Sequence, residues 1–353
     1  MFTVLLFLAV MKHITIKQDT SSPMSVFRVN SVNGRLFHPD LPARDLAVLL
    51  AENLKTVPVG SPIIIMVHGY KFSPLVHANN PHRTIFARHV DRKHWKIRSW
   101  PRQMGVAQYD NRGGLAIGFA WHARSDYFLA RTAVHQVYDR AELEGAQLAR
   151  LINILHDIAP NRKIDIMAHS MGARVVLQSL RHILHQNLGR VVMMGGAEFG
   201  AVALAALQYP AARSAQFYNI TARQNDFYDL LFERFAPSPG PANRALGMDF
   251  PFRRSNWVNI QIDCTSVLQC LGMMGIRMAR PSAGFCHWSF YTRDGVFGLY
   301  HAIFRREAGF SPAELSMRLG NGAQPRKIRA MFKLPYLSFT WLRGLSYRHR
   351  AGL

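Results

Sequence analysis

Short apolar segments recur along the chain, and each is followed by a polar or glycine-containing turn. Five of them have the length of strands: residues 63–67, 114–121, 164–168, 190–194 and 215–221. Consecutive apolar residues without polar alternation, as at residues 63–67 and 114–121, are typical of strands that are buried on both faces. The pattern therefore predicts a sheet whose two faces are both covered.

Segments with helical periodicity lie between these strands. Residues 148–155 place apolar side chains at helical spacing, Asp139 and Glu142 have the spacing of a capping box before them, and Pro160 ends the segment. Residues 175–180 predict a second helix. Strands that alternate with helices favour an α/β fold: a mostly parallel sheet with helices on both faces and ligands bound at the carboxyl ends of the strands.

Composition excludes several classes of protein. The 353 residues are 49% hydrophobic, which excludes wholesale disorder, and only three are cysteines, which excludes a disulfide scaffold. No apolar run reaches the roughly 18 residues of a membrane-spanning helix. The four histidines of the most basic segment, His77, His82, His89 and His94, lack zinc-ligand spacing, as do the cysteines, so we expect no metal.

The net charge of +22 is concentrated in two segments. Residues 71–113 carry nine Lys or Arg against two acids, and residues 311–353 carry eight against one. A basic surface without a dedicated partner and an anionic membrane surface both fit this charge. No nucleic-acid-binding motif accompanies it, so we do not expect a nucleic-acid partner.

The amino terminus does not have the order of a signal peptide. Its apolar run, Met1–Val10, precedes the first basic residue, Lys12, and no Ala-x-Ala site follows. We expect an extension before a first strand at residues 13–17, with Met1 and Met11 both open as the start. The expected location is the cytoplasm, with peripheral membrane contact as the alternative.

The segment Ala168–Gly172 has the pattern of a nucleophile elbow. Ser170 stands between an apolar strand and a helix, and small residues two positions away on either side let strand and helix approach. The backbone N–H of Met171 would face a developing oxyanion. The alternative is a serine that only caps the helix.

A second turn, His68-Gly69-Tyr70, also follows an apolar strand. An N–H from such a turn can complete an oxyanion hole, and Tyr70 is the expected donor beside Met171. The alternative is an ordinary turn at the end of a strand.

These motifs carry a resemblance. A strand ending in Val-His-Gly, a later strand ending at Trp121, and Ala-His-Ser-Met-Gly resemble the α/β-hydrolase superfamily, in particular a group of bacterial α/β-hydrolases of unknown function. The resemblance covers about residues 60–305. It implies a Ser–acid–His triad in that order, acyl-enzyme chemistry on esters or amides, and no cofactor. Lys71 replaces a smaller polar residue of that group, so the mouth of the site is expected to differ.

The resemblance implies that the triad acid follows a strand after Ser170. Asp226, beyond the strand at residues 215–221, is the expected acid, on a polar loop. Asp229 is the alternative and could equally cap the next helix. Glu198, after the fourth strand, is a third candidate.

The base is expected near the end of the domain. His287, in a loop-like stretch, matches that location and would take the proton from Ser170. His301 lies on an apolar, apparently amphipathic segment and is expected to be a packed or surface residue. The side chain of His169 is expected to point away from the site.

Together these features predict a domain at residues 1–310, with residues 71–113 as a basic, cap-like insertion, followed by a basic aromatic extension at 311–353. The expected function is a serine hydrolase that cleaves a small-molecule or lipid carboxylic ester through an acyl-enzyme on Ser170. An acyltransferase with the same triad, or a non-catalytic protein that binds an anionic membrane or acidic partner, is the alternative. The sequence predicts neither the acyl and alcohol groups nor the oligomeric state.

Overall fold

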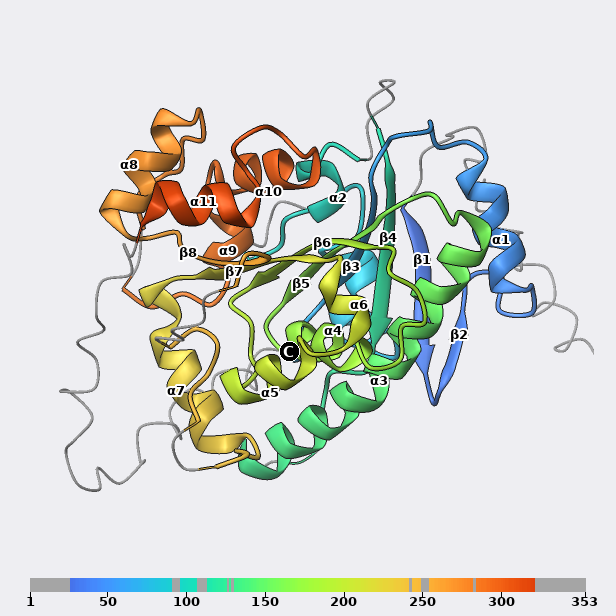
Figure 1. Ribbon diagram of the computed structural model, residues 1–353. Coiled ribbons are helices and arrows are strands. Elements are labelled where there is room, and N and C mark those ends of the chain that lie inside the picture. Colours follow the sequence, from blue (N-terminus) through green and yellow to red (C-terminus); the bar gives the residue numbers. More distant parts are fainter. Residues whose placement is uncertain are drawn as a thin grey trace, which may run out of the picture.

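The computed structural model describes residues 26–90, 96–106, 113–125, 127, 130–240, 243–248, 254–281 and 284–320. Within them, eight strands form one sheet in the order β2-β1-β4-β3-β5-β6-β7-β8 (Figure 1). Every neighbouring pair is parallel except β1 and β2. The strands are β1 (Phe27–Val32), β2 (Arg35–Phe37), β3 (Ile63–Val67), β4 (Leu115–Trp121), β5 (Ile164–His169), β6 (Leu188–Met194), β7 (Gln216–Thr221) and β8 (Trp257–Gln261).

Both faces of the central strands are buried, as the apolar runs predicted. In β3, Ile63, Ile65 and Val67 belong to one hydrophobic core, whereas Ile64 and Met66 belong to a second core across the sheet. Successive side chains of a strand point to opposite faces, so an uninterrupted apolar run supplies both cores at once. The sheet is therefore the middle layer of three.

The helices form the two outer layers (Figure 1). One layer packs on the first core and contains α1 (Leu46–Leu54), α3 (Ala130–Ile158), α4 (Gly172–Ser179), α5 (Gly200–Ala206), α6 (Pro210–Arg213) and α7 (Asp226–Phe235). The other packs on the second core and contains α2 (Trp100–Gln103), α8 (Thr265–Met273), α9 (Ser289–Thr292), α10 (Val296–Phe304) and α11 (Pro312–Leu319). The predicted α/β architecture, with helices on both faces of a mostly parallel sheet, is confirmed.

The long helix α3 differs from its prediction at one end. It begins at Ala130, so Asp139 and Glu142 lie inside the helix and the predicted capping box is wrong. The buried residues Ala133 and Val137 continue the helical face toward the amino terminus and extend the helix past the polar pair. The predicted end before Pro160 is confirmed.

The described parts of the basic insertion pack into the domain. They include two short 3-10 turns, η1 (His77–Asn79) and η2 (Pro81–Arg83), and helix α2. Phe86 and Trp100 are fully buried and belong to the second core, with their ring centroids 5.5 Å apart. These parts of residues 71–113 are thus anchored to the domain by the second core.

Of the two ends of the chain, only parts belong to the described residues. The strand predicted at residues 13–17 and both candidate start residues lie outside them, as does the tail after residue 320. Helix α11 begins with a capping box between Ser311 and Glu314, and Leu315 is fully buried in the second core. The beginning of the predicted extension is therefore part of the domain's packing.

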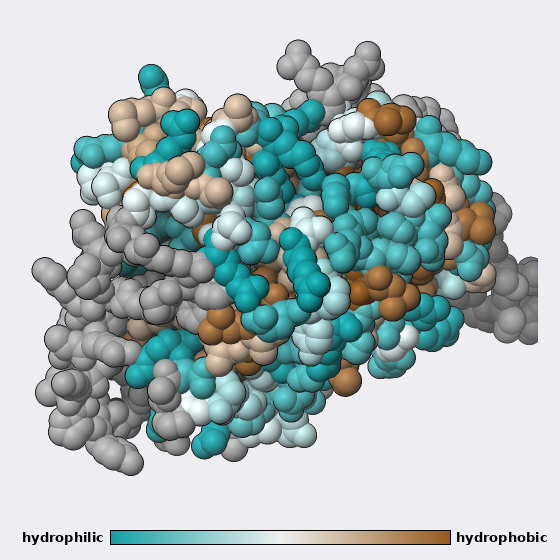
Figure 2. Space-filling model, viewed as in Figure 1, coloured by the Kyte–Doolittle hydropathy of each residue, from teal (hydrophilic) through white to brown (hydrophobic). Residues whose placement is uncertain are grey.

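The surface seen from the side of Figure 1 is mostly hydrophilic, with hydrophobic residues in small separate groups (Figure 2). None of the described helices is long and apolar enough to cross a membrane.

Candidate active site

Ser170 occupies a tight turn between β5 and α4. Its φ of 54° is left-handed, a conformation that non-glycine residues adopt rarely and at a cost of about 1–3 kcal/mol. Two hydrogen bonds hold the turn: Ser170 N–H donates to the Met194 carbonyl (3.1 Å), and Ala197 N–H donates to the Ser170 carbonyl (3.0 Å). This strained strand-to-helix turn has the geometry of a nucleophile elbow.

Two glycines make room for the turn. A Cβ on Gly172 would lie 2.7 Å from the Val67 carbonyl oxygen, and a Cβ on Gly69 would lie 2.5 Å from the Ser170 Cβ. Atoms at such distances overlap, so the absence of side chains is what lets the β3 turn and the start of α4 approach each other.

The backbone N–H groups of Tyr70 and Met171 lie on the two turns that meet beside Ser170. Neither donates a hydrogen bond to another group among the described residues. The next residue, Lys71, has a φ of 76°, and its N–H donates to the Ala123 carbonyl at 2.7 Å. The first turn is thus tied to the end of β4 while the Tyr70 N–H is left available to a ligand.

The buried His68 side chain holds the His68-Gly69-Tyr70 turn through two hydrogen bonds. Its Nε2 accepts from the Trp121 backbone N–H (3.0 Å), so its Nδ1 carries the proton and donates to the Gly69 carbonyl (3.0 Å). Its ring also stacks on Trp121, with the centroids 5.7 Å apart. Burial lowers the pKa of His68 to about 3, so the ring is neutral and this pattern is kept.

His287 lies in the loop before α9 and contacts the elbow. Its Nδ1 is 2.6 Å from Asn225 Oδ1, and Asn225 Nδ2 donates to Asp229 Oδ1 at 2.9 Å. Burial, and next the neighbouring His169, hold the pKa of His287 well below its usual range. The imidazole is therefore neutral, the form that can accept a proton.

The position expected for Asp226 is occupied by its neighbour, Asn225. The turn η3 (Arg223–Asn225) directs the amide of Asn225 to His287, and Asp226 is the first residue of α7 rather than part of a loop. A carboxylate in the first turn is favoured by the positive end of the helix dipole. Asp229, the alternative acid, is linked to His287 through Asn225.

His169 does not point away from this site, which corrects the expectation for its side chain. Its Nε2 donates to the His287 carbonyl at 3.0 Å, and the two ring centroids are 4.6 Å apart. Burial lowers the pKa of His169 to about 4, so it holds the His287 loop as a neutral donor. The residue before Ser170 thus joins the elbow to the loop that carries His287.

Glu198 and His301 have other surroundings. Glu198 is fully buried and binds Arg174 Nη1 at 2.6 Å and the Tyr138 hydroxyl at 2.7 Å. His301 lies on α10, where its Nδ1 is 3.7 Å from Glu307. These contacts assign Glu198 to an ion pair within the core and His301 to the surface.

Aromatic side chains surround the His287 loop. Tyr228 stacks on the His287 ring with centroids 4.8 Å apart, and Trp288 packs edge-on against Tyr228 at 6.0 Å. Phe227 lies 5.8 Å from Phe285, which is 57% exposed. We call Phe227, Tyr228, Phe285 and Trp288 the aromatic rim.

Sequence reasoning missed Asn225 and the aromatic rim. The available signal for Asn225 was its spacing: Asn225 and Asp229 are four residues apart, which places both on one face of a helix. The rim joins α7 to the loop before α9, which are far apart in the sequence, so only the fold brings its members together.

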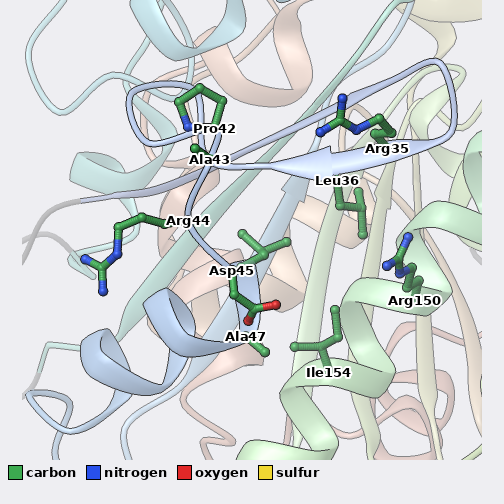
Figure 3. A pocket seen from close by; sticks show the side chains of 10 residues that line it. Arg35, Leu36, Pro42, Ala43, Arg44, Asp45, Ala47, Arg150 and Ile154 are labelled. Carbon is green, nitrogen blue, oxygen red and sulfur yellow. The ribbon is translucent and has the colours of Figure 1, made fainter.

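Other features of the described residues lie apart from this site. Among the described residues, no group of three or more His, Cys, Asp or Glu side chains is arranged to hold a metal ion. A surface hollow of about 490 Å³ lies between β2, α1 and α3 and is lined by residues such as Arg35, Asp45 and Arg150 (Figure 3). Its lining contains none of the residues that surround Ser170 or His287.

The chain is similar to one protein family and, at low levels, to two solved structures. Residues 46–208 match the family model described as "Alpha/beta hydrolase of unknown function (DUF900)". No curated protein matches the chain in sequence. Two solved structures are similar to it at low levels. The Bacillus licheniformis lipase BlEst2 in propeptide form is 12% identical over 47% of this chain, with a TM-score of 0.29. The mature form of that lipase is 11% identical over 52% of this chain, with a TM-score of 0.30.

The chain spans only 37% of the length of the propeptide form and 81% of the mature form. The family match covers β3, β4, β5 and the Ser170 turn. The mostly parallel eight-stranded sheet with helices on both faces is the architecture of the α/β-hydrolase fold, and residues 46–208 are similar to a family of α/β-hydrolases, as the sequence motifs indicated.

Proposed function

We propose that the protein is a serine hydrolase that cleaves a carboxylic ester through an acyl-enzyme on Ser170. The observation that carries the proposal is the left-handed Ser170 turn between β5 and α4, closely approached by Gly69. A left-handed serine destabilises the fold, so it is expected where the hydroxyl takes part in a reaction. A serine that only capped α4 would not need a left-handed backbone.

The proposed reaction follows from the groups around Ser170. His287 Nε2 accepts the hydroxyl proton while Ser170 Oγ attacks the ester carbonyl carbon, which gives a tetrahedral intermediate. The Tyr70 and Met171 N–H groups would bind its oxyanion, and each such donor is worth about 3–4 kcal/mol in the transition state. The intermediate collapses, the alcohol leaves with the proton from His287, and Ser170 keeps the acyl group.

The second half of the reaction repeats these steps with water. His287 takes a proton from water, the hydroxide attacks the acyl-enzyme, and the carboxylic acid leaves as Ser170 regains its proton. An acceptor alcohol in place of water would make the same site an acyltransferase. Product analysis with and without an added alcohol distinguishes these two reactions.

The substrate class is suggested by the aromatic rim. Its rings lie beside His287, where one side of the ester must bind, and aromatic surface favours apolar groups. Two residues of the basic insertion also reach this region: Lys96 Nζ lies 3.9 Å above the Trp288 ring, and Trp100 lies 6.5 Å from the His169 ring. We propose an ester with an apolar acyl or alcohol group, bound between the rim and a cap formed by the insertion.

Hydrolysis of p-nitrophenyl acetate, butyrate and octanoate tests the proposal. Ser170→Ala is expected to lower kcat/KM by about 10⁴-fold or more, whereas the control Ser238→Ala changes an exposed serine and is expected to leave kcat/KM unchanged. Circular dichroism establishes that both variants are folded. Undiminished turnover in Ser170→Ala would refute the proposal.

A further inference from the structure

We propose that Asn225, supported by Asp229, is the group that orients His287, in place of a carboxylate bound directly to the imidazole. The inference rests on the proposed function for its catalytic meaning. Its geometry stands on two hydrogen bonds: His287 Nδ1 to Asn225 Oδ1 at 2.6 Å, and Asn225 Nδ2 to Asp229 Oδ1 at 2.9 Å.

These two bonds determine each other's direction. Asn225 Nδ2 donates to Asp229 Oδ1, so the amide oxygen of Asn225 faces His287. An amide oxygen also only accepts, so the proton of the neutral His287 ring must lie on Nδ1. Nε2 is then the bare nitrogen, which is the one that the proposed reaction needs.

The pair is shielded from water. Asn225 and Asp229 are each 2% exposed, and a Cβ on Gly247 would lie 2.2 Å from Asp229 Oδ2. The Asp229 carboxylate therefore lies directly against the glycine backbone. Hydrogen bonds in such surroundings are stronger than in water, and the amide is expected to keep one orientation.

Asn225 positions the His287 ring, and its neutral amide also affects how strongly the positive charge of His287 is stabilised during the reaction. During the reaction the Ser170 proton moves to His287 Nε2, while the proton on Nδ1 stays on the ring. The imidazolium formed in this step touches a neutral amide, and the Asp229 side chain lies one residue further away. A carboxylate directly on Nδ1 would stabilise the imidazolium more and raise the pKa of His287.

The first experiment reads the tautomer of His287 without using activity. Long-range ¹H–¹⁵N correlation spectra of the ¹⁵N-histidine-labelled full chain, assigned with His287→Gln, should show a proton on Nδ1 and a bare Nε2. Asn225→Ala should shift the ring toward a mixture of tautomers. An Nε2–H ring in the wild type, or an unchanged Nδ1–H ring in folded Asn225→Ala, would overturn the inference.

The second experiment measures the rate of fluorophosphonate labelling at Ser170. Asn225→Ala is expected to slow labelling by on the order of 10²-fold, because the ring loses its orienting partner. Asp229→Asn should slow it as well, since an amide in place of the carboxylate no longer fixes the direction of Asn225. Labelling that is slowed by Asp226→Asn but not by Asn225→Ala would overturn the inference in favour of Asp226.

An exchange variant separates this role from a merely structural one. In Asn225→Asp/Asp229→Asn the carboxylate binds Nδ1 directly and the amide lies behind it. Labelling should be restored relative to Asn225→Ala, and the acid limb of its pH–rate profile should move upward by about one pH unit or more. A slow variant with an unmoved acid limb would count against the inference.

Failure of the proposed function has a different signature. A folded wild-type protein that is not labelled at Ser170 would contradict serine catalysis, while the tautomer of His287 would still decide whether Asn225 orients the ring.

Discussion

Gly69 and Ser170 lie so close together that a Cβ on residue 69 would be 2.5 Å from the Ser170 Cβ and 2.7 Å from the His169 carbonyl oxygen. Gly69→Ala must therefore move the β3 turn away from the elbow, and with it the Tyr70 N–H. We expect the free energy of unfolding to fall by about 1–3 kcal/mol. In the protein that remains folded, we expect kcat/KM to fall at least about tenfold. Urea unfolding and p-nitrophenyl ester hydrolysis measure the two effects.

Gly272 provides the matched control. It lies in α8, and a Cβ there would have no atom within 4 Å. Gly272→Ala is expected to stabilise the fold by up to about 1 kcal/mol and to leave activity unchanged. Equal activity in Gly69→Ala and Gly272→Ala would contradict the tight approach of the two turns.

The buried ion pair between Arg174 and Glu198 gives a prediction about stability. The Arg174 side chain is 5% exposed, that of Glu198 is 0% exposed, and their charged atoms are 2.6 Å apart. Arg174→Met leaves the carboxylate without its cation in the core, so the free energy of unfolding should fall by about 3–5 kcal/mol. Denaturant unfolding measures it.

The exposed pair of Arg44 and Glu52, 2.9 Å apart, is the reference for that measurement. Both side chains are about half exposed, so Arg44→Met should change the free energy of unfolding by less than about 1 kcal/mol. If the free energy of unfolding fell no more in Arg174→Met than in Arg44→Met, the buried pair would contribute little to stability, which would contradict this prediction.

The buried, neutral side chains of His68 and His169 make the free energy of unfolding depend on pH. Burial lowers the pKa values of His68 to about 3 and of His169 to about 4, below the value of about 6.5 in the unfolded chain. The unfolded state therefore binds more protons below pH 6.5, and the stabilisation present above pH 6.5 is lost as the pH falls. Each ring should contribute a loss of roughly 1.4 kcal/mol per pH unit between pH 6 and pH 5, and the slope should decline as the pH approaches the pKa of the folded state.

Unfolding in urea at pH 7, 6 and 5 tests this dependence. His68→Gln removes one of the titrating rings and should make the decline with pH less steep. A variant that is less stable at every pH but keeps the full slope would contradict the account of His68.

Activity should survive at acidic pH. Burial and the neighbouring His169 hold the pKa of His287 well below 6.5, so the ring stays neutral and able to accept a proton as the pH falls past that value. The acid limb of kcat/KM for a p-nitrophenyl ester should therefore have its midpoint below pH 6.5. A midpoint at pH 6.5 or above would show that the site is more open to water than the structure indicates.

The sequence was informative where one physical requirement dominates. A strand buried on both faces favours a run of apolar residues, so residues 63–67, which are all apolar, and residues 164–168, where Asp165 alone is polar, could be identified as strands directly. The elbow needs a serine flanked by small residues, and Ser170 is found at its strained turn. β1 and β8 were missed because their residues, Phe-Arg-Val-Asn-Ser-Val and Trp-Val-Asn-Ile-Gln, contain polar side chains that only the tertiary structure accommodates.

The candidate site was harder to predict because it depends on directions as well as positions. The segment after β7 was expected to supply the partner of His287, and it does, but one turn of 3-10 helix decides whether residue 225 or 226 faces the ring. Hydrophobic pattern carries no information about such a rotation. The role of His169 depends equally on a loop more than a hundred residues away.

The most direct test of the central claim is fluorophosphonate labelling of the purified full-length protein, with the modified peptide mapped by mass spectrometry. The account predicts a single modified residue, Ser170, and loss of the label in Ser170→Ala and in His287→Ala. A folded protein that is not labelled, or one labelled at another serine, would contradict an activated Ser170.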